Sequence, residues 1–166
     1  LEPFSVRLVP PSDLHVTLVP PCDETEVADV IEKLRGAAQN CDGFPLILER
    51  LRYGPTRRQP RLLMAECRPT PEITQLKERL FTALGQTDEY RRPFLPHVTL
   101  ARFPRNGRMI ARRHPIDQDL TFTQRVESVE LYRSPKGGGG GRGYEVVASL
   151  PLCGEDAAST SNMLRA

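Results

Sequence analysis

The chain of 166 residues is 39% hydrophobic, which suits one compact domain with a core and leaves too little chain for two domains. Its net charge of +2 is mild, but arginines gather at 57–61, 91–92 and 102–113. Local basic patches suit a phosphate-bearing partner, and solvated loops are the alternative explanation. We expect one monomeric domain over residues 1–153 and a flexible tail over 154–166.

The cysteine pattern and the hydropathy exclude other classes of protein. The four cysteines show no Cys-x-x-Cys spacing and no nearby histidine, which argues against a zinc site and indicates reduced thiols. No apolar stretch has the length of a membrane span, and no signal-peptide pattern begins the chain. We therefore expect a cytoplasmic protein with no membrane partner, no metal and no cofactor.

The N-terminal segment predicts two strands joined by a turn. Apolar and other residues alternate from Phe4 to Val9, which is typical of a β-strand. The sequence Pro-Pro-Ser-Asp at 10–13 predicts a turn, and a second strand is expected over 14–18. The first histidine, His15, therefore follows a rigid turn.

A helix and a pair of strands are expected next. Asp23 and Glu26 resemble a capping box, and apolar residues then recur at helical spacing up to about Asn40. This pattern predicts an amphipathic helix that covers a sheet. Two antiparallel strands are expected at 44–52 and 61–67.

The second half of the chain continues this alternation. Thr70 and Pro71 begin a second helix, and Gly85 lies just past its end. After a strand that starts at His97, residues 105–119 show no clear pattern, and His114 is expected in an exposed loop. Strands are expected at 121–123, 126–133 and 144–150. The glycine-rich loop at 136–143 lacks the Gly-Lys-Ser/Thr end of a P-loop.

A four-residue sequence, His-Val-Thr-Leu, occurs at 15–18 and again at 97–100, using two of the three histidines. In a β-strand, the histidine and threonine of each copy share one face, while the valine and leucine pack into a core on the other. One such strand is ordinarily a half-buried strand with a satisfied histidine. Two copies facing a common cleft would supply a paired acid and base.

Arg102 lies near the end of the strand that contains the second copy of the repeat. Under strict alternation its side chain would share the face of Val98 and Leu100. If the strand frays after Leu100, Arg102 swings to the mouth of the cleft, where it could bind phosphate. We therefore include Arg102 among the candidate phosphate-binding residues.

The repeat resembles the signature of the two-histidine phosphoesterases, which is His-x-Thr/Ser-x twice, about half a chain apart. Within that group the chain is similar to the LigT-like RNA 2′,3′-cyclic phosphodiesterases, also called 2′-5′ RNA ligases. The similarity includes 9–14 and 92–96, which precede the two copies. It also includes 131–134 followed by a glycine-rich turn and Tyr144, and it covers roughly 6–152.

This resemblance implies an α+β fold that is bilobed, with two antiparallel sheets facing a central cleft and helices on the outside. Such proteins usually begin with a strand and a helix ahead of the segment that here starts at Phe4. We therefore expect either a truncated chain or a missing element that leaves a sheet edge open. The resemblance also implies that an RNA 2′,3′-cyclic phosphate is opened to a 2′-phosphate, and that the reverse reaction forms a 2′-5′ linkage.

The paired motifs suggest a role for each side chain. Imidazole ordinarily has a pKa of about 6.5, so His15 and His97 can act as general acid and base, in an order that stays open. Thr17 and Thr99 would donate hydrogen bonds to the non-bridging phosphate oxygens. Tyr132 alternates away from its apolar neighbours and is predicted to stack on a base, with a packed sheet aromatic as the alternative. The expected partners are RNA ends or small cyclic nucleotides.

Two other classes of function stay open. The same cleft could hold a nucleotide or an RNA end without turnover, as a binding module. Alternatively, the chain is a structural interaction protein whose repeat is accidental, and its two histidines are buried and apart.

Overall fold

The computed structural model describes residues 6–21, 26–56, 58–86, 93–103, 106–133 and 144–154. Several of the expectations concern positions outside the described residues. These positions are Phe4, Cys22, Asp23, Arg57, Arg91, Arg92, the loop at 136–143 and the tail from 155 onward.

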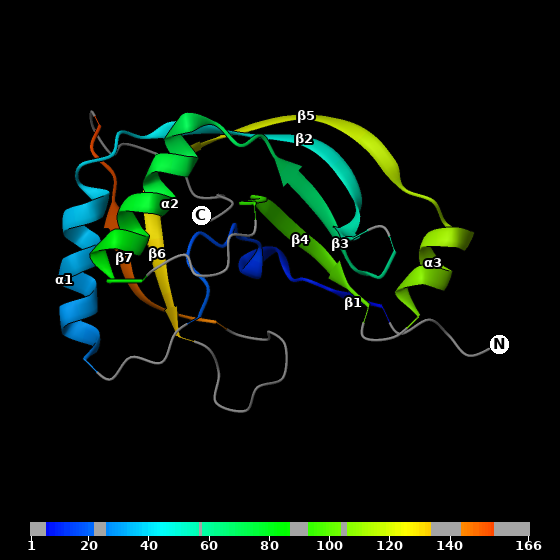
Figure 1. Ribbon diagram of the computed structural model, residues 1–166, viewed down its shortest axis with the longest axis horizontal. Coiled ribbons are helices and arrows are strands. Elements are labelled where there is room, and N and C mark those ends of the chain that lie inside the picture. The colour runs from blue at the N-terminus through cyan, green and yellow to red at the C-terminus, as the bar shows by residue number, and fades with distance from the viewer. Residues whose placement is uncertain are drawn as a thin grey trace.

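The described strands form two antiparallel sheets of unequal size (Figure 1). The larger has five strands in the order β1-β4-β3-β2-β5, and the smaller has two, β6 and β7. Every pairing between these strands is antiparallel, so the expected α+β fold with two antiparallel sheets is confirmed. The strands are β1 (Arg7–Leu8), β2 (Phe44–Pro55), β3 (Pro60–Cys67), β4 (His97–Arg102), β5 (Asp117–Val126), β6 (Ser128–Arg133) and β7 (Glu145–Pro151).

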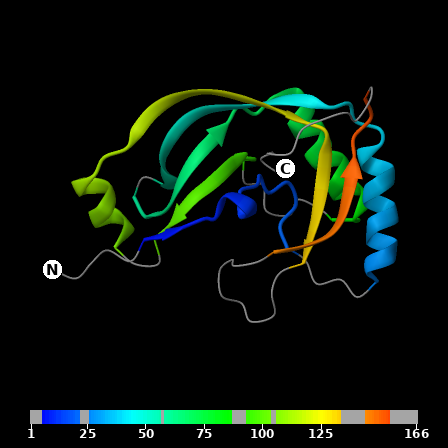
Figure 2. The ribbon, with the colours of Figure 1, turned by 180° about the vertical axis from the view of Figure 1, so that it is seen from behind.

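Three α-helices in the described residues accompany the sheets: α1 (Val27–Ala38), α2 (Pro71–Ala83) and α3 (Gly107–Arg113). In both ribbon views, α1 and α2 lie side by side next to the two-stranded sheet, and α3 lies at the opposite end of the molecule (Figure 1, Figure 2). None of the described helices is long and apolar enough to cross a membrane.

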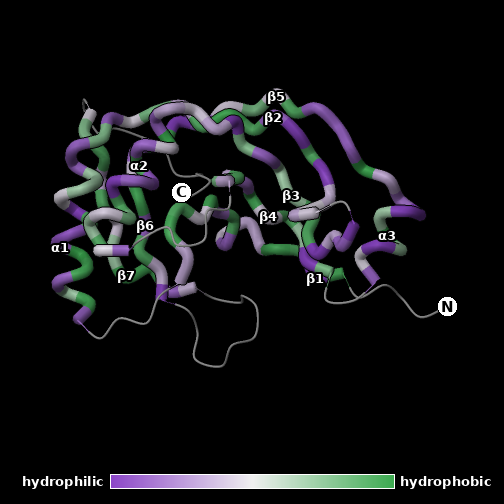
Figure 3. The backbone as a smooth tube through the Cα atoms, viewed as in Figure 1, coloured by the Kyte–Doolittle hydropathy of each residue, from purple (hydrophilic) through white to green (hydrophobic). Residues whose placement is uncertain are grey.

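Local sequence explains the two longer helices. Pro71 occupies the first position of α2, and Gly85 has a φ of 63° just past its end, where a residue without Cβ is favoured. Hydrophilic and hydrophobic residues alternate along α1, which is the pattern of an amphipathic helix (Figure 3). The buried faces are formed by Val30, Leu34 and Ala38 in α1 and by Ile73, Leu76 and Leu80 in α2.

Most of the buried apolar residues in the described part of the chain form two clusters. The larger cluster lies between the sheets and the helices α1 and α2, and it includes Val16 and Val98, the valines of both His-Val-Thr-Leu copies. The smaller cluster lies against α3 and contains Tyr53 and Phe103. Because both valines belong to the main core, the two copies of the repeat are anchored to the same packed interior.

The segment 14–18 differs from the regular strand that was expected. The N–H of Val9 still donates to the Leu100 carbonyl at 2.9 Å, but Pro10 and Pro11 have no N–H to continue the ladder. A 3-10 turn at Pro11–Asp13 follows, and the chain returns to β4 only through a single bridge at Val16. The alternation of exposure persists, since Val16 and Leu18 are buried and Thr17 is exposed.

Residues 105–119 also differ from expectation, because they contain α3 and the start of β5. Asn106 has a φ of 64°, and Gly107 packs so closely that a Cβ on it would lie 2.0 Å from the Pro60 carbonyl oxygen. A short helix held by such a long-range contact leaves no periodic pattern in the sequence. Val126 ends β5 and does not belong to β6. His114 is exposed just after α3, as predicted.

Replacing Leu76 with alanine is expected to lower the free energy of unfolding by about 2–5 kcal/mol, because the change leaves a cavity in the core. Leu76 is 0% exposed in α2, between α1 and the sheet. Urea denaturation followed by circular dichroism measures the effect. The neighbouring exposed Gln75→Ala variant should change stability by less than about 0.5 kcal/mol. Equal effects of the two changes would contradict this packing.

Cys67 is expected to resist alkylation in the folded protein. Burial, together with the negative charges of Glu49 and Glu66, raises the pKa of the Cys67 thiol to about 12, and only the thiolate is an efficient nucleophile. At about pH 8, iodoacetamide should modify the exposed Cys153 at least about tenfold faster than Cys67. Peptide mass spectrometry reads both sites. In urea, where the protein is unfolded, the two cysteines should react at similar rates. Similar rates in the folded protein would show that Cys67 is accessible.

Candidate active site

The two copies of the repeat lie against each other. Val16 and Val98 form an antiparallel bridge, and they are 2% and 1% exposed. Continuing the antiparallel register by one residue in each direction aligns His15 with Thr99 and Thr17 with His97. Each histidine is therefore opposite the threonine of the other copy, and the two copies are related by an approximate twofold axis between the valines.

Both histidines are oriented by the same local hydrogen bond. The Nδ1 atom of His15 lies 2.7 Å from the Asp13 carbonyl oxygen, and Nδ1 of His97 lies 2.8 Å from the Leu95 carbonyl oxygen. A carbonyl oxygen only accepts, so Nδ1 donates in both cases and Nε2 is left for other partners. Each acceptor precedes its histidine by two residues. Asp13 lies in the 3-10 turn, and Leu95 precedes the buried Pro96.

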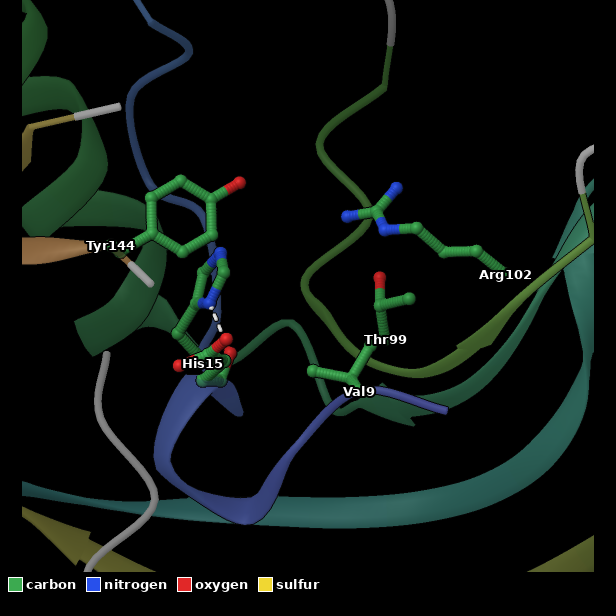
Figure 4. A pocket seen from close by; sticks show the side chains of 6 residues that line it. Val9, His15, Thr99, Arg102 and Tyr144 are labelled. Atoms are coloured by element: carbon green, nitrogen blue, oxygen red, sulfur yellow. Dashed lines mark hydrogen bonds between the residues drawn. The ribbon is translucent and has the colours of Figure 1, made fainter. Parts of the chain in front are cut away.

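A small pocket borders the first histidine. Figure 4 shows the Thr99 hydroxyl and the Arg102 guanidinium directed toward the space beside the His15 imidazole. Arg102 forms no ion pair with any residue in the described part of the chain, so its charge is available to an anion. The residues that line the pocket are Val9, Asp13, His15, Thr99, Arg102 and Tyr144.

A β-bulge directs Arg102 into this pocket. The register between β3 and β4 skips Leu100, so β4 carries one extra residue at that point. A bulge reverses the alternation beyond it. Ala101 consequently points into the core, where it is 1% exposed, and Arg102 returns to the face of Thr99. Arg102 reaches this side without the strand fraying after Leu100, because β4 continues through Arg102.

Two tyrosines surround His15. The ring of Tyr132 lies 5.8 Å from the imidazole, and the ring of Tyr144 lies 5.5 Å from it in an edge-on orientation. The two tyrosine rings are 5.7 Å apart. Sequence reasoning selected Tyr132 but not Tyr144 as a site residue. The available clue was their position, because both tyrosines flank the glycine-rich loop and antiparallel pairing of β6 with β7 brings them together.

His97 and Thr17 do not line the pocket beside His15. Thr17 is exposed, and His97 is partly exposed at the start of β4. The register pairs His97 with Glu66 of β3, whose carboxylate forms an ion pair with Arg52 of β2. The antiparallel register around the two valines is therefore what relates Thr17 of the first copy to His97 of the second.

The remaining charges on the neighbouring strands are largely paired. Arg50 of β2 binds Asp117 of β5 through two hydrogen bonds of 2.6 and 3.0 Å, and this contact raises the pKa of the Arg50 guanidinium. Among the described residues, no group of three or more His, Cys, Asp or Glu side chains is placed to hold a metal ion. The groups that this site offers to an anion are thus the imidazoles, the threonine hydroxyls and Arg102.

Comparison with known proteins points to one family. The model of the 2′-5′ RNA ligase superfamily matches residues 4–138. The crystal structure of the protein TT0787 of Thermus thermophilus superimposes with a TM-score of 0.72 at 25% sequence identity, covering 94% of this chain and 87% of that one. A search of curated protein sequences found no match.

Escherichia coli LigT has a similar fold. Its complex with 3′-AMP gives a TM-score of 0.65 at 23% identity, covering 92% of this chain and 84% of LigT. Its complex with ATP gives 0.63 at 25% identity, covering 89% and 81%. With the family match over most of the chain, the paired motifs and the shared architecture lead to one conclusion. The chain belongs to the 2′-5′ RNA ligase superfamily and is a LigT-like two-histidine phosphoesterase.

Proposed function

We propose that the protein hydrolyses RNA ends that carry a 2′,3′-cyclic phosphate, giving a 2′-phosphate without the aid of a metal ion. His15 and His97 act as the general acid and base. The observation that supports this most strongly is the Val16–Val98 bridge, which sets each histidine opposite the threonine of the other copy. Membership of the superfamily makes a phosphodiester the natural substrate.

The reaction needs two proton transfers on opposite sides of phosphorus. One neutral imidazole accepts a proton from water as its oxygen attacks phosphorus. The other imidazole, protonated, gives its proton to the 3′-oxygen as the bond from phosphorus to that oxygen breaks. Because Nδ1 is already bound to a carbonyl in both histidines, Nε2 performs both transfers. When the 5′-hydroxyl of a second RNA replaces water as the nucleophile, the same two proton transfers form a bond from phosphorus to the 5′-oxygen and break the bond to the 3′-oxygen, which leaves a 2′-5′ linkage.

The other side chains stabilise the charge on the phosphate. Thr17 and Thr99 donate hydrogen bonds to the two non-bridging oxygens, one from each copy, as the approximate twofold axis suggests. Arg102, which has no ion-pair partner within the described residues, adds a positive charge at the pocket beside His15.

The aromatic residues beside His15 suit a terminal nucleobase. Tyr132 and Tyr144 form an aromatic wall next to the imidazole, and unpaired RNA bases are bound by stacking on such rings. E. coli LigT, which shares the fold, has been crystallised with 3′-AMP and with ATP. Tyr132 and Tyr144 are therefore proposed to contact the base of the reacting nucleotide.

The direct test is incubation with an RNA oligomer that ends in a 2′,3′-cyclic phosphate, with the product identified by phosphorus NMR. Formation of a 2′-phosphate supports the proposal. Binding of the oligomer without turnover would instead favour a non-catalytic binding module. A 3′-phosphate product would show that the opposite ester bond is broken.

Alanine at either His15 or His97 should lower the rate of cyclic-phosphate hydrolysis by about a hundredfold or more, the usual contribution of a positioned acid or base. The third histidine supplies a matched control, since His114 is exposed and lies beyond α3. The variant His114→Ala should retain activity. The paired mechanism is wrong if a folded His15→Ala or His97→Ala variant turns over at the wild-type rate.

Activity should persist in EDTA and pass through a maximum with pH. At low pH the imidazole that acts as base becomes protonated, and at high pH the imidazole that acts as acid loses its proton. The two apparent pKa values of the kcat/KM profile belong to the coupled pair. Activity that is lost in EDTA and restored by a divalent cation would contradict the metal-independent mechanism.

A further inference from the structure

A second concave surface lies at the end of the large sheet, between the β2–β3 turn and the start of α3. Figure 1 shows this end of the sheet on the side of the molecule away from α1. We refer to this surface as the hairpin groove. Among the described residues that line it, none is acidic. These residues are Arg58, Gln59, Pro60, Arg61, Phe103, Asn106, Gly107 and Arg108.

The positive charge of the hairpin groove is not neutralised by the described part of the chain. Arg58, Arg61 and Arg108 are exposed, and their guanidinium groups form no ion pair or hydrogen bond with the described residues. By contrast, Arg50 and Arg52 on the sheet are both paired with carboxylates. Gathered like charges repel one another, and their field favours a bound anion.

The hairpin groove is built by a close backbone contact. A Cβ on Gly107 would lie 2.0 Å from the Pro60 carbonyl oxygen, so only glycine lets α3 approach the turn this closely. That approach brings Arg108 to the side of the hairpin arginines. The amide side chains of Gln59 and Asn106 add neutral hydrogen-bond donors to the lining.

The hairpin groove adjoins the active site through the end of β4. Arg102 lines the pocket beside His15, and the next residue, Phe103, lines the hairpin groove. The N–H of Phe103 donates to the Arg61 carbonyl at 2.8 Å, which ties this point of the chain to the hairpin. Because strand alternation turns Phe103 to the side of the buried Ala101, an anionic polymer with one end at Arg102 would pass the end of β4 to reach the hairpin arginines.

We propose that the hairpin groove binds the phosphodiester backbone of the RNA strand whose cyclic phosphate end occupies the active site. This inference rests on the proposed function and adds a second binding surface, which holds the part of the RNA strand that precedes the reacting end. Arginine suits phosphate because its planar guanidinium can donate two parallel hydrogen bonds. The aromatic residue among the described lining residues, Phe103, is 6% exposed, so it offers little ring surface on which a base could stack, and the three arginines favour contacts to phosphate.

The test compares the KM for 2′,3′-cyclic AMP with the KM for a cyclic-ended RNA of about ten nucleotides, a length within common single-strand site sizes. The variant is Arg58→Gln/Arg108→Gln. The control is Arg35→Gln/Arg125→Gln, which removes the same charge from two paired arginines outside the groove.

The groove variant should raise the KM for the oligomer about five- to tenfold at low salt, in line with exposed charge pairs. The KM for 2′,3′-cyclic AMP and the kcat for both substrates should stay unchanged. The slope of log KM against log salt should fall by about 1.4, because two phosphate contacts are lost. The control should retain the wild-type values for both substrates.

The proposal is overturned if the groove variant changes the KM for both substrates equally or leaves the KM for the oligomer unchanged. It is also overturned if the control variant changes the KM for the oligomer as much as the groove variant does. If the wild-type protein opens neither substrate, the proposed function is wrong, and this result by itself says nothing about the groove. The groove is then tested by fluorescence anisotropy with a labelled RNA oligomer that ends in a 2′-phosphate. Weaker binding by the groove variant than by the control supports the groove, and equal binding overturns it.

Discussion

The antiparallel bridge between Val16 and Val98 is the contact on which the arrangement of the site depends. Both valines are buried in the main core, so the alternation of the chain turns the histidine and threonine of each copy to the opposite side. The bridge also sets the register. A shift of one residue would reverse the facing of every side chain in one copy, and the pairing of histidine with threonine would be lost.

Prolines hold each histidine in place from its N-terminal side. Pro10 and Pro11 interrupt the ladder to β4 and lead into the 3-10 turn whose Asp13 carbonyl accepts from His15. At the second copy, the Leu95 carbonyl accepts from His97 across the buried Pro96. The same ring nitrogen is engaged at both sites. Two unrelated local structures therefore engage the same nitrogen, Nδ1, and leave Nε2 outside these carbonyl contacts.

The two halves of the site are nonetheless unequal in their surroundings. His15 lies beside Tyr132, Tyr144 and the pocket that contains Arg102. His97 begins β4 opposite an ion pair between Glu66 and Arg52. Aromatic rings and an arginine are therefore concentrated on the His15 side of the site. The hairpin groove, with three further arginines, is lined by Phe103, the residue that follows β4.

The sequence by itself determined the features that depend on short-range periodicity. These include the amphipathic helices, the antiparallel hairpins and the repeated His-Val-Thr-Leu, because alternation and capping are local properties. The orientation of Arg102, the place of Tyr144 and the formation of α3 were decided only by tertiary structure. The bulge at Leu100 is created by pairing with β3, and α3 is held by contact between Gly107 and Pro60. Such contacts join residues far apart in the chain, and no pattern within one segment encodes them.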